Sequence, residues 1–579
     1  MAQKTKWKTA AAAAAAVTAA GASSLAAKRM KQKEFCPICE WKRLTGKLML
    51  HPVTSPDCGN GTAKTPPMGW SSWNLFERNI NETLILEIAA AMQSSGLADA
   101  GYRYVNLDDC WQSSERDEQG HLQADLSAFP HGIRALADKV NALGLKLGIY
   151  SSNGERTCED YPASLRHEAI DADTFAAWGV EYFKYDFCHN RPISEKAPLV
   201  SGIELSRPGE GAYETIAPDA VTCSGRARVF VDEKNACAYL TGLDSRAGTF
   251  CFSTEAQADC EIVLTLKVKK PADAERFLRL TVNGKDEYHL YAPKMRAPVP
   301  DPGDRRIQTT VRLQKGKNTL VFDNPVRSRF DSAALQYQLM GRELRRAARE
   351  FSEKNGTEEK PIVYSICEWG FNFPWKWGRQ AGNLWRTTGD IKPVWASVLT
   401  IYERNVRLWK YAAPGGWNDP DMLEVGVGKL TEDENRAHFS LWCMMAAPLI
   451  LGNDVRTFVL PDGSADTKNK TLQMLTNKAM IDIDQDALGM QCRRIKAGLQ
   501  DVLVKPLTGA RAAVCVFNKA RRPADVALDL NAVANEGFVQ LPQKDCYEVF
   551  DVWENETKQC TGALSASVKP HGVKVYIIK

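Results

Sequence analysis

The sequence lacks a surplus of charge of either sign and, beyond residue 29, any apolar run long enough to cross a membrane. Its 579 residues contain 74 Lys and Arg against 70 Asp and Glu, which gives a formal net charge of +4. No basic stretch alternates with aromatic residues, as a nucleic-acid surface would require. The composition therefore predicts neither nucleic acid nor a membrane as a partner, and it favours a neutral ligand.

Markers of disorder and of small disulfide scaffolds are also missing. The chain is 44% hydrophobic and 25% charged, and its length exceeds the ~250–300 residues at which a single core stops growing. Several globular domains are therefore expected. The 16 Cys are too few for a disulfide-built fold, although their pairing favours an oxidising compartment. The 15 Trp, 16 Tyr and 20 Phe supply flat faces that either pack cores or stack on sugars.

The N-terminus has the shape of a signal peptide. Three lysines precede an uncharged stretch over residues 9–27, and Lys28 and Arg29 follow it at once. Alanine dominates the stretch, so a low-complexity helical tail is the alternative. We assign residues 1–64 to a leader and N-terminal extension and predict a secreted or extracytoplasmic protein, with a cytoplasmic one as the alternative.

Two stretches of the chain alternate short apolar runs with amphipathic helical ones, which is typical of βαβ units. Four such units lie between residues 65 and about 190, and four more follow residue 333. Eight units predict a closed (β/α)₈ TIM barrel over residues 65–485. An open doubly wound sheet is the competing fold, but no Gly-rich phosphate loop follows the first strand. The expected strands are Met68–Trp73, Tyr102–Asp108, Leu145–Tyr150, Tyr182–Asp186, Ile362–Cys367, Leu384–Thr387, Trp417–Met422 and Leu449–Gly452.

Two further segments contain only short β-type runs with Gly, Pro and Asn turns between them. Residues 200–333 predict a β-sandwich inserted into the barrel after its fourth strand, and hence on the catalytic rim. Residues 486–579 predict a C-terminal antiparallel β-sandwich. The fold class is therefore α/β, with one inserted and one C-terminal β domain.

Acidic, basic and aromatic residues follow most of the expected barrel strands. Because the carboxyl ends of barrel strands meet at one mouth, these side chains should converge. Carboxylates that accept from hydroxyls, with indoles that cover C–H faces, suit a polyhydroxylated neutral ligand. Glycoside hydrolysis also needs two carboxyl groups. The residues are Trp70, Trp73, Asp108, Asp109, Trp111, Lys184, Asp186, Glu368, Trp369, Arg386, Asp390, Asp419 and Asp421.

Nine sequence motifs make the chain similar to one enzyme family. They are PPMGWSSWN from Pro66, YVNLDDCW from Tyr104, LGIYSS from Leu147, GVEYFKYDFC from Gly179, CEWG from Cys367, WRTTGDI from Trp385, GGWNDPDML from Gly415, HFSLWCMMAAPLILGNDVR from His438 and VKPHG from Val568. In this order they resemble the α-galactosidase (melibiase) family of retaining glycosidases, glycoside hydrolase family 27. The resemblance covers nearly all of the barrel and the tail.

The resemblance implies the two catalytic roles. Asp186 in KYDFC would be the nucleophile, with Lys184 holding it ionised, because a nearby ammonium favours the carboxylate. Asp390 in WRTTGD would be the acid/base, with Arg386 anchoring the sugar near its 2-hydroxyl. The plainer interpretations are a strand-end salt bridge for Asp186 and a helix N-cap for Asp390. No metal and no cofactor is implied.

The resemblance also implies a galactose pocket. Asp108 and Asp109 would receive the 4- and 6-hydroxyls, and Trp70 would stack on the C6 side. Asp419 is expected to be a structural brace, with a position in the pocket as the alternative. Glu368 and Trp369 would leave no space for an N-acetyl group at C2. Cys158, Cys367, Asp421 and Met422 match further pocket positions.

The cysteines partly depart from the family pattern. The resemblance implies a Cys158–Cys188 disulfide beside the nucleophile. It also implies a bridge from Cys110 to the first loop, where this chain has Glu77 and Arg78, so Cys110 is expected to be a buried free thiol. Four insert cysteines, Cys223, Cys237, Cys251 and Cys260, could form two bridges in three ways. Near the N-terminus, Cys36, Cys39, His51 and Cys58 could surround zinc, although a disulfide or an unstructured leader is favoured.

The inserted segment resembles carbohydrate-binding modules in its strand texture. Its candidate stacking residues are Tyr239, Phe252, Tyr288 and Tyr291, with core packing as the alternative. We therefore predict a retaining exo-glycosidase that releases terminal α-linked D-galactose. The alternatives are an α-N-acetylgalactosaminidase, a β-L-arabinopyranosidase or a transglycosidase of the same family, and a non-catalytic carbohydrate-binding protein.

Overall fold

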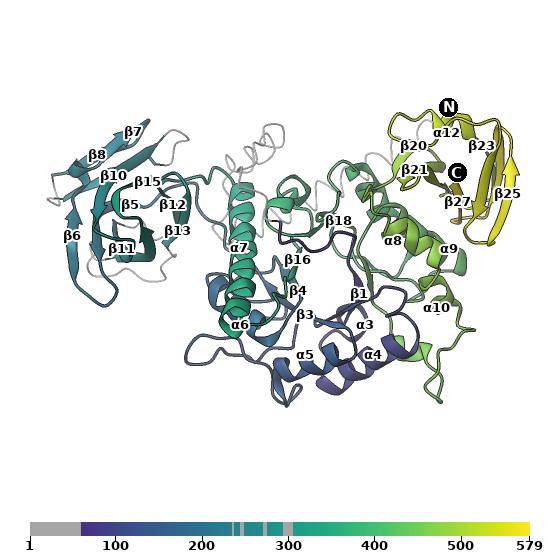
Figure 1. Ribbon diagram of the computed structural model, residues 1–579, viewed down its shortest axis with the longest axis horizontal. Coiled ribbons are helices and arrows are strands. Elements are labelled where there is room, and N and C mark those ends of the chain that lie inside the picture. The colour runs from purple at the N-terminus through teal and green to yellow at the C-terminus, as the bar shows by residue number, and fades with distance from the viewer. Residues whose placement is uncertain (1–58, 234–236, 244–247, 270–274, 293–304) are drawn as a thin grey trace, which may run out of the picture. The chain divides into compact units, whose positions relative to one another are not determined.

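The computed structural model describes residues 59–233, 237–243, 248–269, 275–292 and 305–579 (Figure 1). The chain forms two compact units. One contains residues Pro192–Ser332, and the other contains residues 59–191 together with Ala333–Lys579. The four possible ligands between Cys36 and Cys58, and the signal-like segment, lie outside the described residues.

The second unit contains the predicted (β/α)₈ barrel. Its eight strands pair in parallel in the order β18-β17-β16-β4-β3-β2-β1-β19. A parallel bridge between Leu423 and Leu451 links the segment after β18 to β19 and closes the circle. The TIM-barrel prediction is confirmed. The strands are β1 (Met68–Ser71), β2 (Tyr104–Asn106), β3 (Lys146–Ser152), β4 (Tyr182–Asp186), β16 (Val363–Ile366), β17 (Leu384–Arg386), β18 (Trp417–Asp419) and β19 (Leu449–Leu451).

Helices cover the outside of this barrel. Four of them begin at polar caps that the sequence supplies. The Asn81 side chain accepts from the Leu84 amide, Thr431 and Glu434 form a capping box, and Asn469 and Asn477 cap the two short helices that follow. The helices are α3 (Trp73–Phe76), α4 (Glu82–Ser94), α5 (Gly132–Ala142), α6 (Glu168–Trp178), α7 (Arg329–Asn355), α8 (Trp395–Asn405), α9 (Glu432–Met444), α10 (Lys470–Leu475) and α11 (Lys478–Asp484). Among the described residues, no helix is long and apolar enough to span a bilayer.

Two features of the barrel go beyond what the hydrophobic pattern predicts: a required glycine in β1 and contacts made by residues before 65. A Cβ added at Gly69 would lie 2.4 Å from the Tyr104 carbonyl oxygen, so only glycine allows β1 and β2 to pair this closely. Contacts with the barrel also begin before residue 65. The Asn60 side chain donates to the Ile362 carbonyl at 2.8 Å, and the Trp417 indole donates to the Ala63 carbonyl at 2.8 Å.

The first unit is a sandwich of two antiparallel sheets. One sheet has the order β13-β12-β15-β10-β7, and the other has the order β14-β11-β5-β9-β8, with β6 paired to β5. The strands are β5 (Leu199–Ser206), β6 (Ala212–Ile216), β7 (Thr222–Ser224), β8 (Arg228–Asp232), β9 (Cys237–Thr241), β10 (Thr249–Ala256), β11 (Cys260–Lys269), β12 (Arg276–Val282), β13 (Asp286–Ala292), β14 (Arg305–Leu313) and β15 (Gly316–Asp323). The two ends of the unit meet, because the Ile193 amide donates to the Ser332 hydroxyl at 2.8 Å.

The core of this sandwich absorbs one candidate sugar-stacking residue. Phe252 is buried and stacks at 6.1 Å on Phe322, so its assignment to a ligand surface is wrong and the core alternative holds. Cys223, Cys251 and Cys260 are free thiols, so the two bridges considered among the insert cysteines do not form.

The C-terminal segment forms the predicted antiparallel sandwich. A six-stranded sheet, β20-β21-β22-β27-β24-β25, lies over the pair β23-β26, and valine, leucine and alanine side chains fill the core. Buried Asp501 accepts from Tyr402 of α8 at 2.8 Å, which ties this domain to the barrel. The elements are β20 (Arg493–Lys496), β21 (Gln500–Leu507), β22 (Arg511–Asn518), β23 (Ala524–Asp529), α12 (Leu530–Ala534), β24 (Tyr547–Asp551), β25 (Glu556–Cys560), β26 (Ala563–Val568) and β27 (Val573–Ile578).

Candidate active site

A polar pocket lies at the carboxyl ends of the barrel strands. Five of the residues predicted for substrate binding line it: Asp108, Lys184, Arg386, Asp421 and Met422. Each comes from a different strand end or its loop, apart from the neighbours Asp421 and Met422, so the barrel brings together side chains far apart in the sequence. Sequence reasoning missed Ser71, Asn106, Tyr182, Ser365 and Ile450, which also line the pocket from inward-facing strand positions.

Lys184 connects two of the predicted carboxylates. Its Nζ lies 2.7 Å from Asp108 Oδ2 and 3.8 Å from Asp186 Oδ2, so its closer partner is Asp108. Asp186 ends β4 and is buried, and its Oδ1 accepts from the Phe187 amide at 2.8 Å. Burial raises the pKa of Asp186 to about 6. Lys184 lowers this pKa, as predicted, but the effect of burial is larger.

Arg386 connects two more of the predicted carboxylates, those of Asp390 and Asp421. This buried guanidinium donates through Nη2 to Asp390 Oδ1 at 2.9 Å and pairs with Asp421 Oδ2 at 2.7 Å. The Asp390 side chain is 72% exposed, which leaves it reachable by a ligand. Partial burial raises the pKa of Asp390, but Arg386 and Lys184 outweigh it, so the pKa lies below its usual value.

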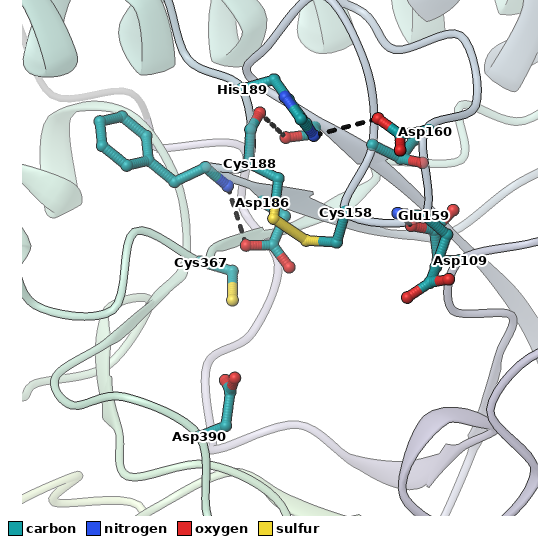
Figure 2. Close-up of a disulfide and its surroundings, with 12 residues drawn as sticks. Asp109, Cys158, Glu159, Asp160, Asp186, Cys188, His189, Cys367 and Asp390 are labelled. Atoms are coloured by element: carbon teal, nitrogen blue, oxygen red, sulfur yellow. Dashed lines mark hydrogen bonds and ion pairs between the residues drawn. A yellow bond between two sulfur atoms is a disulfide. The ribbon is translucent and has the colours of Figure 1, made fainter. Parts of the chain in front are cut away.

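The Asp186 and Asp390 side chains lie across from one another, on two sides of one space (Figure 2). Their carboxyl groups point toward one another from separate strand ends, and the Cys367 thiol lies beside that space. Buried Cys367 Sγ accepts from Arg386 Nη1 at 3.6 Å, so it belongs to the wall of the site. Two facing carboxyl groups are the arrangement that a glycoside-cleaving site requires.

The Cys158–Cys188 disulfide is present, as predicted. It joins the loop after β3 to the residues that follow Asp186. Asp109 lies against the same loop, because its Oδ2 accepts from the Glu159 amide at 3.0 Å. Burial raises the pKa of Asp109 to about 6. The other carboxylate oxygen, Oδ1, accepts from the Cys110 amide at 2.8 Å. The predicted contact of Asp109 with a sugar hydroxyl stays a prediction.

The loop after β1, which lacks the cysteine of the expected bridge, forms an ion pair instead. Arg78 forms an ion pair with Glu159, and Cys110 is a buried free thiol, as predicted. Both side chains act electrostatically on Cys110, and burial raises the pKa of its thiol to about 12. The Arg78–Glu159 ion pair joins this first loop to the loop after β3, whereas the bridge implied by the resemblance would have joined the first loop to Cys110.

Two predicted substrate contacts are fully buried. The Trp70 indole donates to the Asn453 carbonyl at 2.7 Å. Glu368 accepts the Asn372 amide at 2.9 Å and 2.7 Å through its two carboxylate oxygens. Their predicted roles toward a sugar stay predictions. These hydrogen bonds show that Glu368 fixes the shape of its own loop. The neighbouring Trp369 is only half-buried.

Asp419 has the contacts of a brace. Its carboxylate accepts from the Asp421 amide at 2.8 Å, and its carbonyl accepts from the Thr387 amide at 2.9 Å. Burial raises its pKa to about 6. These bonds hold the loops after β17 and β18 together, next to Arg386.

Within the described ranges, the group of possible metal ligands that lies close together is Cys158, Asp186 and Cys188. The disulfide uses both sulfurs, and a cysteine binds a metal only as a thiolate. This group is therefore no metal site.

The disulfide should contribute to stability as well as to geometry. It closes a 30-residue separation, so removing both cysteines as Cys158→Ala/Cys188→Ala is expected to lower the free energy of unfolding by about 3–4 kcal/mol. Urea unfolding followed by tryptophan fluorescence would measure the loss. The matched control removes two exposed free thiols, Cys260→Ala/Cys546→Ala. Equal midpoints for the two double variants would contradict the prediction.

Comparison with known proteins identifies the family. A family model described as alpha galactosidase A matches residues 65–206 and 316–486, and one described as the alpha galactosidase C-terminal beta sandwich domain matches residues 497–578. Alpha-galactosidase 3 of Arabidopsis thaliana is 33% identical over 526 residues, covering 90% of this chain and 83% of its own. Alpha-galactosidase A of Cellvibrio japonicus (strain Ueda107) is 32% identical over 89% of this chain and 91% of its own.

A solved structure agrees with these relatives. Alpha-galactosidase I from Mortierella vinacea superposes with a TM-score of 0.60 at 27% identity, covering 90% of this chain and 98% of its own. The first family-model match is interrupted between residues 206 and 316, within the inserted sandwich. On these matches, the chain belongs to the α-galactosidase (melibiase) family, glycoside hydrolase family 27.

Proposed function

We propose that the protein is a retaining exo-α-galactosidase that removes terminal α-linked D-galactose from oligosaccharides, polysaccharides or glycoconjugates. The observation that carries the proposal is the pair of facing carboxyl groups, buried Asp186 and exposed Asp390. The relatives described as α-galactosidases over most of the chain support the choice of sugar.

In the first step, an Asp186 carboxylate oxygen attacks the anomeric carbon as the bond from that carbon to the leaving oxygen breaks. Asp390 gives its proton to the leaving oxygen, so the aglycone departs as a neutral alcohol and a β-linked galactosyl-enzyme remains. In the second step, Asp390 takes a proton from water, whose oxygen attacks the anomeric carbon and releases α-galactose and the Asp186 carboxylate. Two inversions give net retention.

The charges around the pocket fit this role. Lys184 holds Asp108 at 2.7 Å, and Arg386 holds Asp421 at 2.7 Å, so two ion pairs face a ligand made of hydroxyl groups. Each pair presents donors and acceptors already fixed in place, which orients a neutral sugar without adding net charge.

The pKa values predict an unusual pH dependence. Asp186 must be ionised and Asp390 protonated, yet the pKa of Asp186 is raised to about 6 and that of Asp390 is lowered. The reactive form therefore holds its proton on the more acidic group. For an oligosaccharide, kcat/KM should fall as pH rises above about 6, because the enzyme then loses the proton that the leaving oxygen needs.

A substrate whose leaving group needs no proton should show the opposite limb. For α-galactosyl fluoride, kcat/KM should increase as pH rises through about 6, because only the ionisation of Asp186 matters. Paired pH profiles of melibiose and the fluoride measure this. Parallel profiles for the two substrates would contradict the assignment of the pKa near 6 to the nucleophile.

The proposed function is tested with p-nitrophenyl glycosides. Turnover of the α-galactoside that Asp186→Ala abolishes supports it. Turnover of the α-N-acetylgalactosaminide or the β-L-arabinopyranoside instead would keep the mechanism and overturn the sugar. No turnover of any of the three would favour a binding protein.

A further inference from the structure

The loop between β16 and β17 carries a run of aromatic side chains that the proposed mechanism does not use. Between residues 369 and 375 lie Trp369, Phe371, Phe373 and Trp375, with no Leu, Ile, Val or Met among them. Phe371 is 61% exposed, and the other three are half-buried. Exposing a phenylalanine this far forfeits the free energy of its burial, which raises the question of what covers it.

The loop lies between the segments that bear the two catalytic carboxyl groups. Phe187, the residue after Asp186, contacts the Trp369 ring edge-on at 6.3 Å. On the other side, a Cβ added at Gly370 would lie 2.2 Å from the carbonyl oxygen of Thr387, three residues before Asp390. The loop is thus continuous with both halves of the site.

Phe371 is presented by a fixed backbone. Glu368 accepts from the Asn372 amide and side chain, and the Trp377 indole donates to the Asn372 carbonyl at 2.9 Å. Trp369 and Phe373 both have left-handed backbone, with φ of 55° and 56°. Bulky residues keep this conformation only where their surroundings impose it. The Phe371 ring in turn rests edge-on against Trp369 at 5.6 Å.

We propose that Phe371, supported by Trp369, is a stacking platform for the sugar unit on the reducing side of the scissile bond. The proposal rests on the proposed function. Rigid aromatic faces suit the apolar C–H side of a pyranose, while the adjacent Asn372 offers a polar contact to its hydroxyls. Because the run contains four aromatic side chains and no Leu, Ile, Val or Met, it fits a saccharide aglycone better than a lipid chain.

The test is a ratio of two substrates. Raffinose has a sugar on the reducing side of its galactose, whereas α-galactosyl fluoride has only a fluorine atom there. In Phe371→Ala, the ratio of kcat/KM for raffinose to kcat/KM for the fluoride should fall about 3- to 10-fold, the range expected for one aromatic contact. Phe371→Tyr, which keeps the ring, should restore the ratio.

A matched control separates stacking from loss of an exposed ring. Phe230 in β8 is 45% exposed and packs against Tyr239 at 5.1 Å in the other unit, so Phe230→Ala should leave the ratio unchanged. An unchanged ratio in Phe371→Ala, whether both substrates slow equally or neither does, would overturn the platform. Failure of the unaltered protein to hydrolyse the fluoride would overturn the proposed function, and this inference with it. A loss seen for an alkyl α-galactoside but not for raffinose would assign the platform to a lipid.

Discussion

Replacing Asp186 by alanine is expected to lower kcat/KM for p-nitrophenyl α-galactoside by at least about 10⁴-fold, because the covalent step loses the atom that attacks the anomeric carbon. The cavity left by the missing carboxylate should admit azide, which would attack from the same side. A single displacement inverts the anomeric centre, so the expected product is β-galactosyl azide. Nuclear magnetic resonance of the product distinguishes it from the α-anomer.

The control for this variant is an aspartate of the neighbouring loop. Asp160 is exposed and pairs with His189 at 3.3 Å (Figure 2), and asparagine tolerates its left-handed backbone, with φ of 67°. Asp160→Asn should retain nearly full activity. An α-galactosyl azide product from Asp186→Ala, or activity above about one per cent of the unaltered protein, would exclude Asp186 as the nucleophile.

Replacing Asp390 by alanine should give a loss that depends on the leaving group. For melibiose, whose leaving alcohol needs a proton, we expect kcat/KM to fall about 10²- to 10⁴-fold, the usual contribution of a general acid. For 2,4-dinitrophenyl α-galactoside, whose leaving group departs unaided, the first step should be nearly unimpaired and a galactosyl-enzyme should accumulate as a burst. Azide should then release α-galactosyl azide, because two displacements restore the configuration.

The difference between the two substrates distinguishes an acid/base role for Asp390 from a structural one. A uniform loss across both leaving groups would indicate that Asp390 only positions Arg386, its partner at 2.9 Å. Asp390→Asn keeps the size of the side chain and should reproduce the dependence on the leaving group. Mass spectrometry of the intact protein would detect the accumulated intermediate.

The barrel could be predicted because its signal is repetitive. Most units place a short buried strand before a helix, and this repetition outweighs an error in any one unit. The exception among the described residues lies between β16 and β17, where the structure has two short 3₁₀ helices and no α-helix. Strand ends were less certain. The second strand was expected over Tyr102–Asp108, but β2 covers Tyr104–Asn106. These three residues are the ones that pair with both neighbouring strands, β1 and β3.

The chemistry of the site was only partly predictable. Motifs named Lys184 and Arg386, but which carboxylate each one holds depends on how far neighbouring parallel strands are shifted. Lys184 therefore lies closer to Asp108, in the segment after β2, than to Asp186, two residues away on its own strand. The Arg78–Glu159 ion pair likewise has no local pattern, because it joins loops 81 residues apart in the chain. The export predicted from residues 1–29 stays a prediction.

The neighbouring ends of the inserted sandwich have a consequence for how the chain is made. Strand β4 ends at Asp186, and its partner β16 begins only at Val363, so a nascent half-barrel carries an unpaired edge while the ribosome adds the insertion. The insertion has its own core and can fold first. Once the Ile193 amide reaches the Ser332 hydroxyl, the long detour behaves as a short loop, and the entropy lost when β16 joins β4 is correspondingly small. Mutations that slow folding of the sandwich should therefore lower the yield of barrel without touching any residue of the barrel.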